Sequence, residues 1–315
     1  MNTLTPAFDQ PVPDGGYLWW YLDALSDDRK HGITLIAFVG SVFSPYYAWA
    51  RKAGKGLAAN HCAINVALYG KGGKRWALTE RGSRDLERTA RTLSVGPSSV
   101  EWTGSSLDIR VDERTFPLPG RIKGRIRIHP RAMQDTTYSL DGAGRHRWRP
   151  IAPGSRIEVE LEKPDLSWQG EAYVDSNAGD EPLENGFVRW DWSRGCPNPG
   201  ETVIYYDVLR KTGEHYNLAV RCDDRGGATE IESPRRVTLP GTLWGIPRAT
   251  RVDQTLPVKV ESTLEDTPFY ARSLLSTFLL GKATPAIHES LSLERFRSPI
   301  VQLMLPFRMP RHAAS

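Results

Sequence analysis

The sequence predicts a mainly β fold built from antiparallel strands. Short apolar runs recur along the chain and are separated by turn-forming residues. Several of these runs alternate between apolar and polar side chains with a period of two, as half-buried strands do. The 28 glycines and 23 prolines among 315 residues exceed the roughly 12% of average usage, so many turns must punctuate the segments. A helical period is visible only over 83–93 and 269–280, and we expect both helices to be too short to organise the fold.

The first strands are expected in the N-terminal quarter of the chain, over 15–26, 32–43, 61–70 and 74–82. The run at 32–43 is apolar at nearly every position, which is typical of a strand buried on both faces. We expect the following SPYYAWAR to form an aromatic turn, and a membrane-touching loop is the alternative. We interpret His61, beside Cys62, as a strand histidine with a hydrogen-bond partner, because no further ligands follow at metal spacing.

The middle of the chain shows the alternation most clearly. Within 122–128 the isoleucines occupy even positions and the Lys and Arg residues odd ones, so one face is expected in the core and the other in water. The segment 156–161 repeats this pattern, and 203–209 predicts a more deeply buried strand. The polar stretch 180–186 then interrupts the strands, which predicts two domains, 1–184 and 185–315. The polar stretch 223–230 is the alternative boundary.

Composition excludes several classes of protein. The net charge of +4 is spread over 41 basic and 37 acidic residues, which does not form a nucleic-acid-binding stripe. Three cysteines without CxxC spacing support neither a zinc site nor a disulfide framework, so we expect a reducing compartment. No signal peptide is visible, and the longest apolar run, 32–43, is about ten residues too short for a spanning helix. Nucleotide, flavin and zinc-hydrolase motifs are missing, so no metal and no cofactor are expected.

The candidate site lies in the aromatic-rich region 146–192. In a strand, Tyr173, Asp175 and Asn177 project from one face, and Trp190 and Trp192 share a face for the same reason. His146 and Trp148 form a similar pair, and Trp168 lies nearby in sequence. A carboxyl group among aromatic rings in a barrel interior is desolvated, which raises its pKa toward that of a general acid. The alternative is a turn over 175–179, with the tryptophans as ordinary core.

Long stretches of the chain resemble the carotenoid 1,2-hydratases, also called hydroxyneurosporene synthases. These stretches are GGYLWWYLDALSDD, HGITLIAFVGSVFSPYYAWAR, HCAINVALYG, RWALTERG, the block 146–194 and ERFRSPIVQLMLPFRMPR. The resemblance implies two lipocalin-like β-barrel or sandwich domains and a cofactor-independent bacterial enzyme of carotenoid biosynthesis. Such an enzyme adds water across the terminal C1–C2 double bond of acyclic carotenoids such as neurosporene and lycopene. The wider lipocalin-like superfamily often has His at the positions of Val174 or Ser176, so the functional residues of that wider group transfer less well to this chain.

Site roles follow from the resemblance and from the chemistry of an unpolarised alkene. Hydration requires a proton donor to C2, which produces a tertiary cation at C1 that water captures. The resemblance places the acid at Asp175, with Tyr173 beside it and His146 and Trp148 on the preceding strand. Ring faces of Trp148 and Tyr173 could stabilise the cation, and His146 could position water or tune Asp175. Substrate contacts are expected from the remaining polar and aromatic residues of the block, Trp168, Asn177, Trp190 and Trp192.

Two other functions stay open at the level of sequence. One is a non-catalytic lipocalin-like carrier of a carotenoid or another isoprenoid, which has no reason to bury Asp175 beside Tyr173. The other is a lipocalin-like polyene cyclase, which would not need an acid at this position. The preferred carotenoid, hydration at one end or both, and the oligomeric state do not follow from the sequence.

The C-terminal segment 295–311 carries Arg295, Arg297, Arg308 and Arg311 and no acidic residue. Between these arginines lies the apolar run 299–307. We expect this run to form a last barrel strand bounded by prolines, at the mouth of a substrate tunnel. Basic residues around an apolar segment also suit an anionic lipid surface. We therefore predict peripheral, salt-sensitive attachment to the cytoplasmic face of the inner or photosynthetic membrane.

Overall fold

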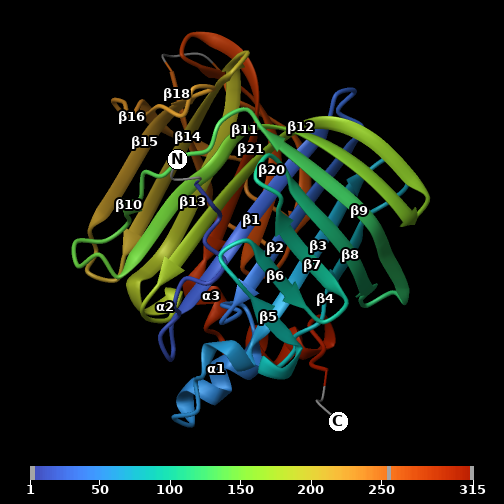
Figure 1. The fold of residues 1–315 in the computed structure, drawn as a ribbon. Coiled ribbons are helices and arrows are strands. Elements are labelled where there is room, and N and C mark those ends of the chain that lie inside the picture. The colour runs from blue at the N-terminus through green and yellow to red at the C-terminus, as the bar shows by residue number, and fades with distance from the viewer. Residues whose placement is uncertain (1–3, 254–256, 313–315) are drawn as a thin grey trace. The chain divides into compact units, whose positions relative to one another are not determined.

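The computed structural model describes residues 4–253 and 257–312 and divides the chain into two compact units (Figure 1). Unit 1 comprises the chain up to Ser139, Ala143–Pro182 and the C-terminal segment from Leu303. Unit 2 comprises Leu140–Gly142 and Leu183–Gln302. The predicted boundary between 184 and 185 therefore lies beside the change of unit. The last residues, expected in the second domain, lie instead in unit 1, because Glu80 pairs through its backbone with Pro310 and His312.

Unit 1 contains a closed ring of antiparallel strands. β9 pairs with both β8 and β11 and thereby completes a circuit through β12, β1, β2, β3 and β4. A closed barrel leaves no unpaired strand edge in this circuit. Short strands β5 (Leu86–Arg88), β6 (Thr92–Val95) and β7 (Ser98–Trp102) extend the sheet from β8, and β10 (Tyr138–Ser139) extends it from β11. The strands of the ring are β1 (Tyr17–Ser26), β2 (His31–Val39), β3 (Cys62–Gly70), β4 (Arg75–Leu78), β8 (Leu107–Thr115), β9 (Gly120–Pro130), β11 (His146–Lys163) and β12 (Leu166–Gly179).

Aliphatic side chains from alternate positions of these strands fill the barrel. The expected alternation is confirmed in β9, where Ile122, Ile126 and Ile128 are buried, and in β11, where Ile157 and Val159 are buried. A cavity of only about 20 Å³ lies among the interior side chains of Trp20, Leu35, Ile109 and their neighbours. This volume holds about one water molecule, so the interior of this barrel is a packed core.

Unit 2 consists of a seven-stranded antiparallel sheet in the order β16-β15-β14-β13-β21-β20-β19 and a two-stranded ribbon, β17–β18. The predicted buried strand at 203–209 is confirmed as part of β14. The ribbon contacts one face of the sheet. Ser193 Oγ lies 3.3 Å from Thr250 Oγ1, and Arg251 Nη2 donates to Asp207 Oδ1 at 2.7 Å. The strands are β13 (Phe187–Asn198), β14 (Glu201–Arg210), β15 (His215–Asp223), β16 (Ala228–Glu230), β17 (Arg235–Leu239), β18 (Arg248–Val252), β19 (Lys259–Asp266), β20 (Tyr270–Leu279) and β21 (Lys282–Ser292).

The two predicted helices are wrong. Residues 83–93 form the 3₁₀ turn η2 (Ser83–Asp85) and the short strands β5 and β6, and 269–280 lies in β20. In β20 the buried apolar residues Ala271, Leu275 and Leu279 share one face of the strand and lie four residues apart, so their spacing mimics a helical period. The strand at 32–43 is confirmed as β2, whereas the expected turn after it is the helix α1 (Pro45–Lys52), capped by Ser44. Another 3₁₀ turn, η1 (Ala58–Asn60), precedes β3, and α2 (Leu183–Gly186) precedes β13.

The strand expected over 299–307 is also wrong. This segment forms α4 (Pro299–Met304) and the 3₁₀ turn η3 (Leu305–Phe307), after the short helix α3 (Leu293–Phe296). Proline fits the first turn of a helix, where its missing N–H costs nothing, so Pro299 and Pro306 begin helical turns here instead of bounding a strand. Among the described residues, no helix has the length and apolar character needed to cross a membrane.

Candidate active site

Asp175 lies on the sheet face opposite the apolar core of unit 1. Val174 and Ala178, at even positions of β12, belong to the core, so the odd positions Tyr173, Asp175 and Asn177 project to the other face. The expectation of a barrel interior is therefore wrong, because the interior is apolar and filled. The shared face is as predicted, and β12 runs through 175–179 where the alternative expected a turn. Asp175 is nevertheless only 2% exposed.

Two donors hold one oxygen of the Asp175 carboxyl group. Trp148 Nε1 and Tyr173 Oη each donate a hydrogen bond of 2.8 Å to Asp175 Oδ2. Oδ2 therefore acts as an acceptor, and a protonated Asp175 would carry its proton on Oδ1. Hydrogen bonds of this kind stabilise the charged form of a carboxyl group.

A β-bulge in β11 lies across from Asp175. Arg149 pairs with Ser176 and Ala152 with Val174, so two residues, Pro150 and Ile151, occupy the place opposite Asp175. Proline suits this place because it has no N–H to offer the ladder. Bulges twist a strand locally and change the direction of side chains. Here the bulge follows Trp148, whose indole N–H donates to Asp175 although its Cα pairs with Asn177.

His146 lies on the same face but further along the strand. It pairs with Gly179, four residues from Asp175, which corresponds to about 13 Å along β12. Its Nδ1 lies 2.9 Å from Tyr17 Oη, and its Nε2 lies 3.4 Å from Glu181 Oε1. Tyr17 can reach it because residue 179 is glycine, since a Cβ there would lie 2.2 Å from the Tyr17 ring. This arrangement fixes the imidazole between a phenol and a carboxylate at one end of the site face.

Strand β1 contributes side chains that the sequence interpretation missed. Trp19, Tyr21 and Asp23 pair with Asn177, Asp175 and Tyr173 respectively and therefore share their face. All three are buried, and Asp23 is 1% exposed. The signal was present as the odd positions of YLWWYLD, but β1 is apolar or aromatic on both faces, so no alternation drew attention to it.

The remaining predicted substrate-binding residues divide between the two units. Asn177 lies on the site face, paired with Trp148 on one side and Trp19 on the other. Trp168 does not join this face, because its even position directs it toward the apolar core, where it packs half-buried. Trp190 and Trp192 are buried residues of β13 in unit 2, and Trp190 packs against Phe187 and Tyr206. Their role in substrate binding stays a prediction.

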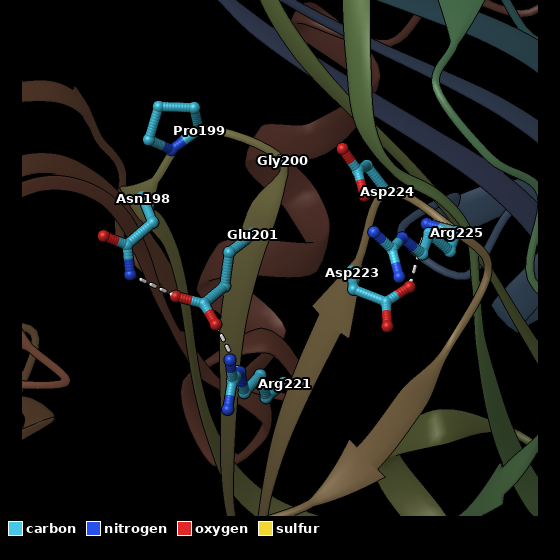
Figure 2. Close-up of a pocket in the computed structure, with 8 residues that line it drawn as sticks. All are labelled: Asn198, Pro199, Gly200, Glu201, Arg221, Asp223, Asp224 and Arg225. Atoms are coloured by element: carbon cyan, nitrogen blue, oxygen red, sulfur yellow. Dashed lines mark hydrogen bonds and ion pairs between the residues drawn. The ribbon is translucent and has the colours of Figure 1, made fainter.

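Unit 2 has a strongly polar pocket away from Asp175 in sequence. This pocket has a volume of about 350 Å³. Its lining residues come from the turn at 198–200 and from the end of β15 (Figure 2). Its charged side chains bind one another, with Glu201 accepting from Asn198 and pairing with Arg221. Such a surface does not suit an apolar polyene. The described part of the chain holds no group of three His, Cys, Asp or Glu residues arranged to bind a metal ion.

The fold is that of a lipocalin-like β-barrel protein, and the buried carboxyl group with aromatic donors on its outer face is the kind of arrangement that acid-catalysing enzymes use. Residues 35–315 match the family described as Carotenoid hydratase CrtC. The chain belongs to this family of hydro-lyases, and the prediction of a carotenoid hydratase is confirmed.

Two relatives show how far the similarity extends. The chain is 55% identical to the acyclic carotenoid 1,2-hydratase of Thiocapsa roseopersicina over 97% of its own length and 76% of that protein. It is 53% identical to the enzyme of the same name from Rubrivivax gelatinosus, over 98% of its length and 76% of the relative. The fold resembles the crystal structure of an AttH-type protein from Nitrosomonas europaea, with a TM-score of 0.59, 12% identity, and coverage of 92% and 99% of the two chains. The predicted mainly β, lipocalin-like class is thereby confirmed.

Proposed function

We propose that this chain adds water across the terminal C1–C2 double bond of acyclic carotenoids such as neurosporene and lycopene, with Asp175 as the proton donor. The observation that carries the assignment is the Asp175 carboxyl group, 2% exposed and held through Oδ2 by Trp148 and Tyr173. Asp175 transfers its proton to C2, the positive charge forms at the tertiary carbon C1, and water adds there. Aromatic rings on the same face stabilise the cation, by up to about 2 kcal/mol for a desolvated contact.

Replacing Asp175 by Asn tests the assignment. Asn keeps the size of the side chain and can still accept from Trp148 and Tyr173, but it has no acidic proton to give. Purified wild-type protein incubated with lycopene and no added cofactor should yield a product heavier by one water. The Asp175→Asn protein should yield at least 100-fold less product, with an unchanged circular dichroism spectrum. Full turnover by this variant would remove Asp175 from the mechanism, and binding without turnover by the wild type would instead favour a carrier.

Peripheral attachment to the cytoplasmic face of the inner or photosynthetic membrane is the second part of the proposal, because a C40 polyene resides in the bilayer. Its support is a stripe of exposed apolar side chains on α4 and η3. Ile300 is 73% exposed and Phe307 is 82% exposed, and Leu303 and Met304 lie between them at helical spacing. Each such side chain that leaves water contributes about 1.5–3 kcal/mol.

The structure changes which groups are expected to drive attachment. Arg295 donates to the carbonyl groups of Trp244 and Gly245, Arg308 lies 4.5 Å from the centre of the Trp76 ring, and Arg311 pairs with Glu80. Arg297 is the exposed member of the four. The apolar stripe should therefore dominate, with a smaller, salt-sensitive contribution of about 1 kcal/mol for each arginine near an anionic surface.

Sedimentation with anionic liposomes measures this attachment. An Ile300→Ser/Leu303→Ser/Phe307→Ser variant should remain in the supernatant at both salt concentrations. Arg297→Ala should sediment somewhat less than wild type at low salt and equally at high salt, where the contribution of this arginine is screened in both proteins. The exposed apolar residue Leu118, on the β8–β9 turn, provides the matched control as Leu118→Ser. Equal sedimentation of the triple variant and wild type would contradict attachment through α4 and η3.

A further inference from the structure

Strands β1 and β12 carry the same short pattern on the site face, a tyrosine followed two residues later by an aspartate. In β1, Tyr21 Oη donates to Asp23 Oδ2 at 2.8 Å. In β12, Tyr173 Oη donates to Asp175 Oδ2 at 2.8 Å. We call these two units the Tyr-x-Asp pairs. Their equal geometry indicates that the two buried carboxyl groups belong to one arrangement.

The strand register brings the two Tyr-x-Asp pairs together head to tail. Tyr21 pairs with Asp175, and Asp23 pairs with Tyr173, so each aspartate faces the tyrosine of the other pair. The two phenol rings meet edge to face with their centres 6.2 Å apart. The aspartates are then diagonal neighbours across the two strands, and the Cα atoms of such neighbours lie about 7–8 Å apart. Because both side chains project from the same face, the two carboxyl groups border the same part of the site face.

Both carboxyl groups are removed from water. Asp23 and Asp175 are 1% and 2% exposed. The addition of water to an alkene uses an acid that protonates one carbon and a base that takes a proton from the water. Two buried carboxyl groups on one face provide one candidate for each role.

We propose that Asp23 is the proton acceptor of the hydration reaction, an inference that rests on the proposed function. Asp175 gives its proton to C2 and becomes a carboxylate, and the electron pair of the double bond forms the new C–H bond. Water bonds through its oxygen to the cationic C1 and loses a proton to the Asp23 carboxylate. This proton passes from Asp23 back to Asp175, which restores both groups, so water is the one molecule consumed.

Deuterium exchange separates the two proton transfers. In D2O, reversible protonation by Asp175 introduces deuterium into recovered lycopene, whether or not water then adds. Asp23→Asn should form alcohol at least 100-fold more slowly while recovered lycopene still gains deuterium. Asp175→Asn should lose both signals. Added formate, a small carboxylate base, should restore at least a tenfold increase in alcohol formation to an Asp23→Ser variant, which has space for it.

Two comparisons make the result decisive. Asp191→Asn removes a buried aspartate of unit 2 that is 3% exposed, and alcohol formation should be unchanged. Wild-type protein must form the alcohol, and its failure to do so would overturn the proposed function itself. With an active wild type, alcohol formation by Asp23→Asn at the wild-type rate would overturn the role of Asp23. Loss of both deuterium and alcohol in a folded Asp23→Asn protein, or no formate effect on Asp23→Ser, would likewise overturn it.

Discussion

Two buried titratable groups of unit 2 should impose opposite pH dependences on stability. Burial raises the pKa of Asp191 to about 6, although Ser290 donates to Oδ1 at 2.5 Å and Arg189 and Arg236 lie close to the carboxyl group. Burial lowers the pKa of His288 to about 4, with its Nε2 2.7 Å from the Ala249 carbonyl oxygen. Neither group is among the charges that shift the pKa of the other, so we expect them to titrate independently.

The sizes of the two effects follow from linkage. Asp191 binds its proton more tightly in the folded protein, so its contribution to stability is lost as pH rises from about 4 to about 6, by roughly 3 kcal/mol at 1.36 kcal/mol per pKa unit. His288 binds its proton less tightly when folded, so stability is lost as pH falls from about 6.5 to about 4, again by roughly 3 kcal/mol. The two slopes oppose each other between pH 4 and 6 in the wild type.

Replacing Asp191 by Asn removes the pH dependence of stability that Asp191 contributes and leaves the one that His288 contributes. Asn resembles the protonated carboxyl group, so the variant should match wild type near pH 4 and exceed its unfolding free energy by about 3 kcal/mol at pH 7. Urea unfolding at pH 4, 5, 6 and 7 measures the difference, and carboxyl ¹³C NMR follows the titration of Asp191 directly. A difference between the two proteins that does not vary with pH would refute the reasoning.

Four further outcomes are expected. Trp148→Phe removes one donor to Asp175 and should lower the hydration rate about 10- to 100-fold while the protein stays folded, and unchanged turnover would exclude the indole N–H from catalysis. Gly179→Ala places a Cβ against the Tyr17 ring and should destabilise the protein by about 1–3 kcal/mol in urea unfolding, unlike Gly142→Ala, which meets no atom within 4 Å. Arg81→Met leaves Glu113 buried without its bidentate partner and should cost about 3–5 kcal/mol by the same measurement, a larger loss than Arg127→Met on the surface. Hydration should survive exhaustive dialysis against a chelator, and loss of activity that one metal ion restores would contradict an acid mechanism based on Asp175.

The hydrophobic periodicity of the sequence predicted much of the fold and part of the candidate site. Alternation identified β9 and β11, and it placed Tyr173, Asp175 and Asn177 on one face of β12. It could not say which face, because a period of two fixes which side chains lie together and leaves open which set meets the core. Both faces of β12 are buried around Asp175, so hydropathy did not distinguish them.

The errors have physical causes of the same kind. Asp23 was missed because β1 is buried on both faces and its aspartate follows a run of aromatic and aliphatic residues. The segment 299–307 was interpreted as a strand because its exposed apolar side chains resemble a buried run in sequence. The bulge at Pro150 and Ile151 is a shift in the pairing of β11 with β12. The sequence of β11 alone therefore does not predict it.

The packed interior of unit 1 makes the two sets of positions in β1 and β12 separable for protein engineering. Leu18, Trp20 and Leu22 belong to the apolar core of unit 1, and Trp19, Tyr21 and Asp23 between them lie on the face of the candidate site. Libraries that vary the odd positions of these strands can therefore explore other alkenes without repacking the barrel. Stabilising substitutions at the even positions of the same strands can offset the loss of folding stability that substitutions in the site cause.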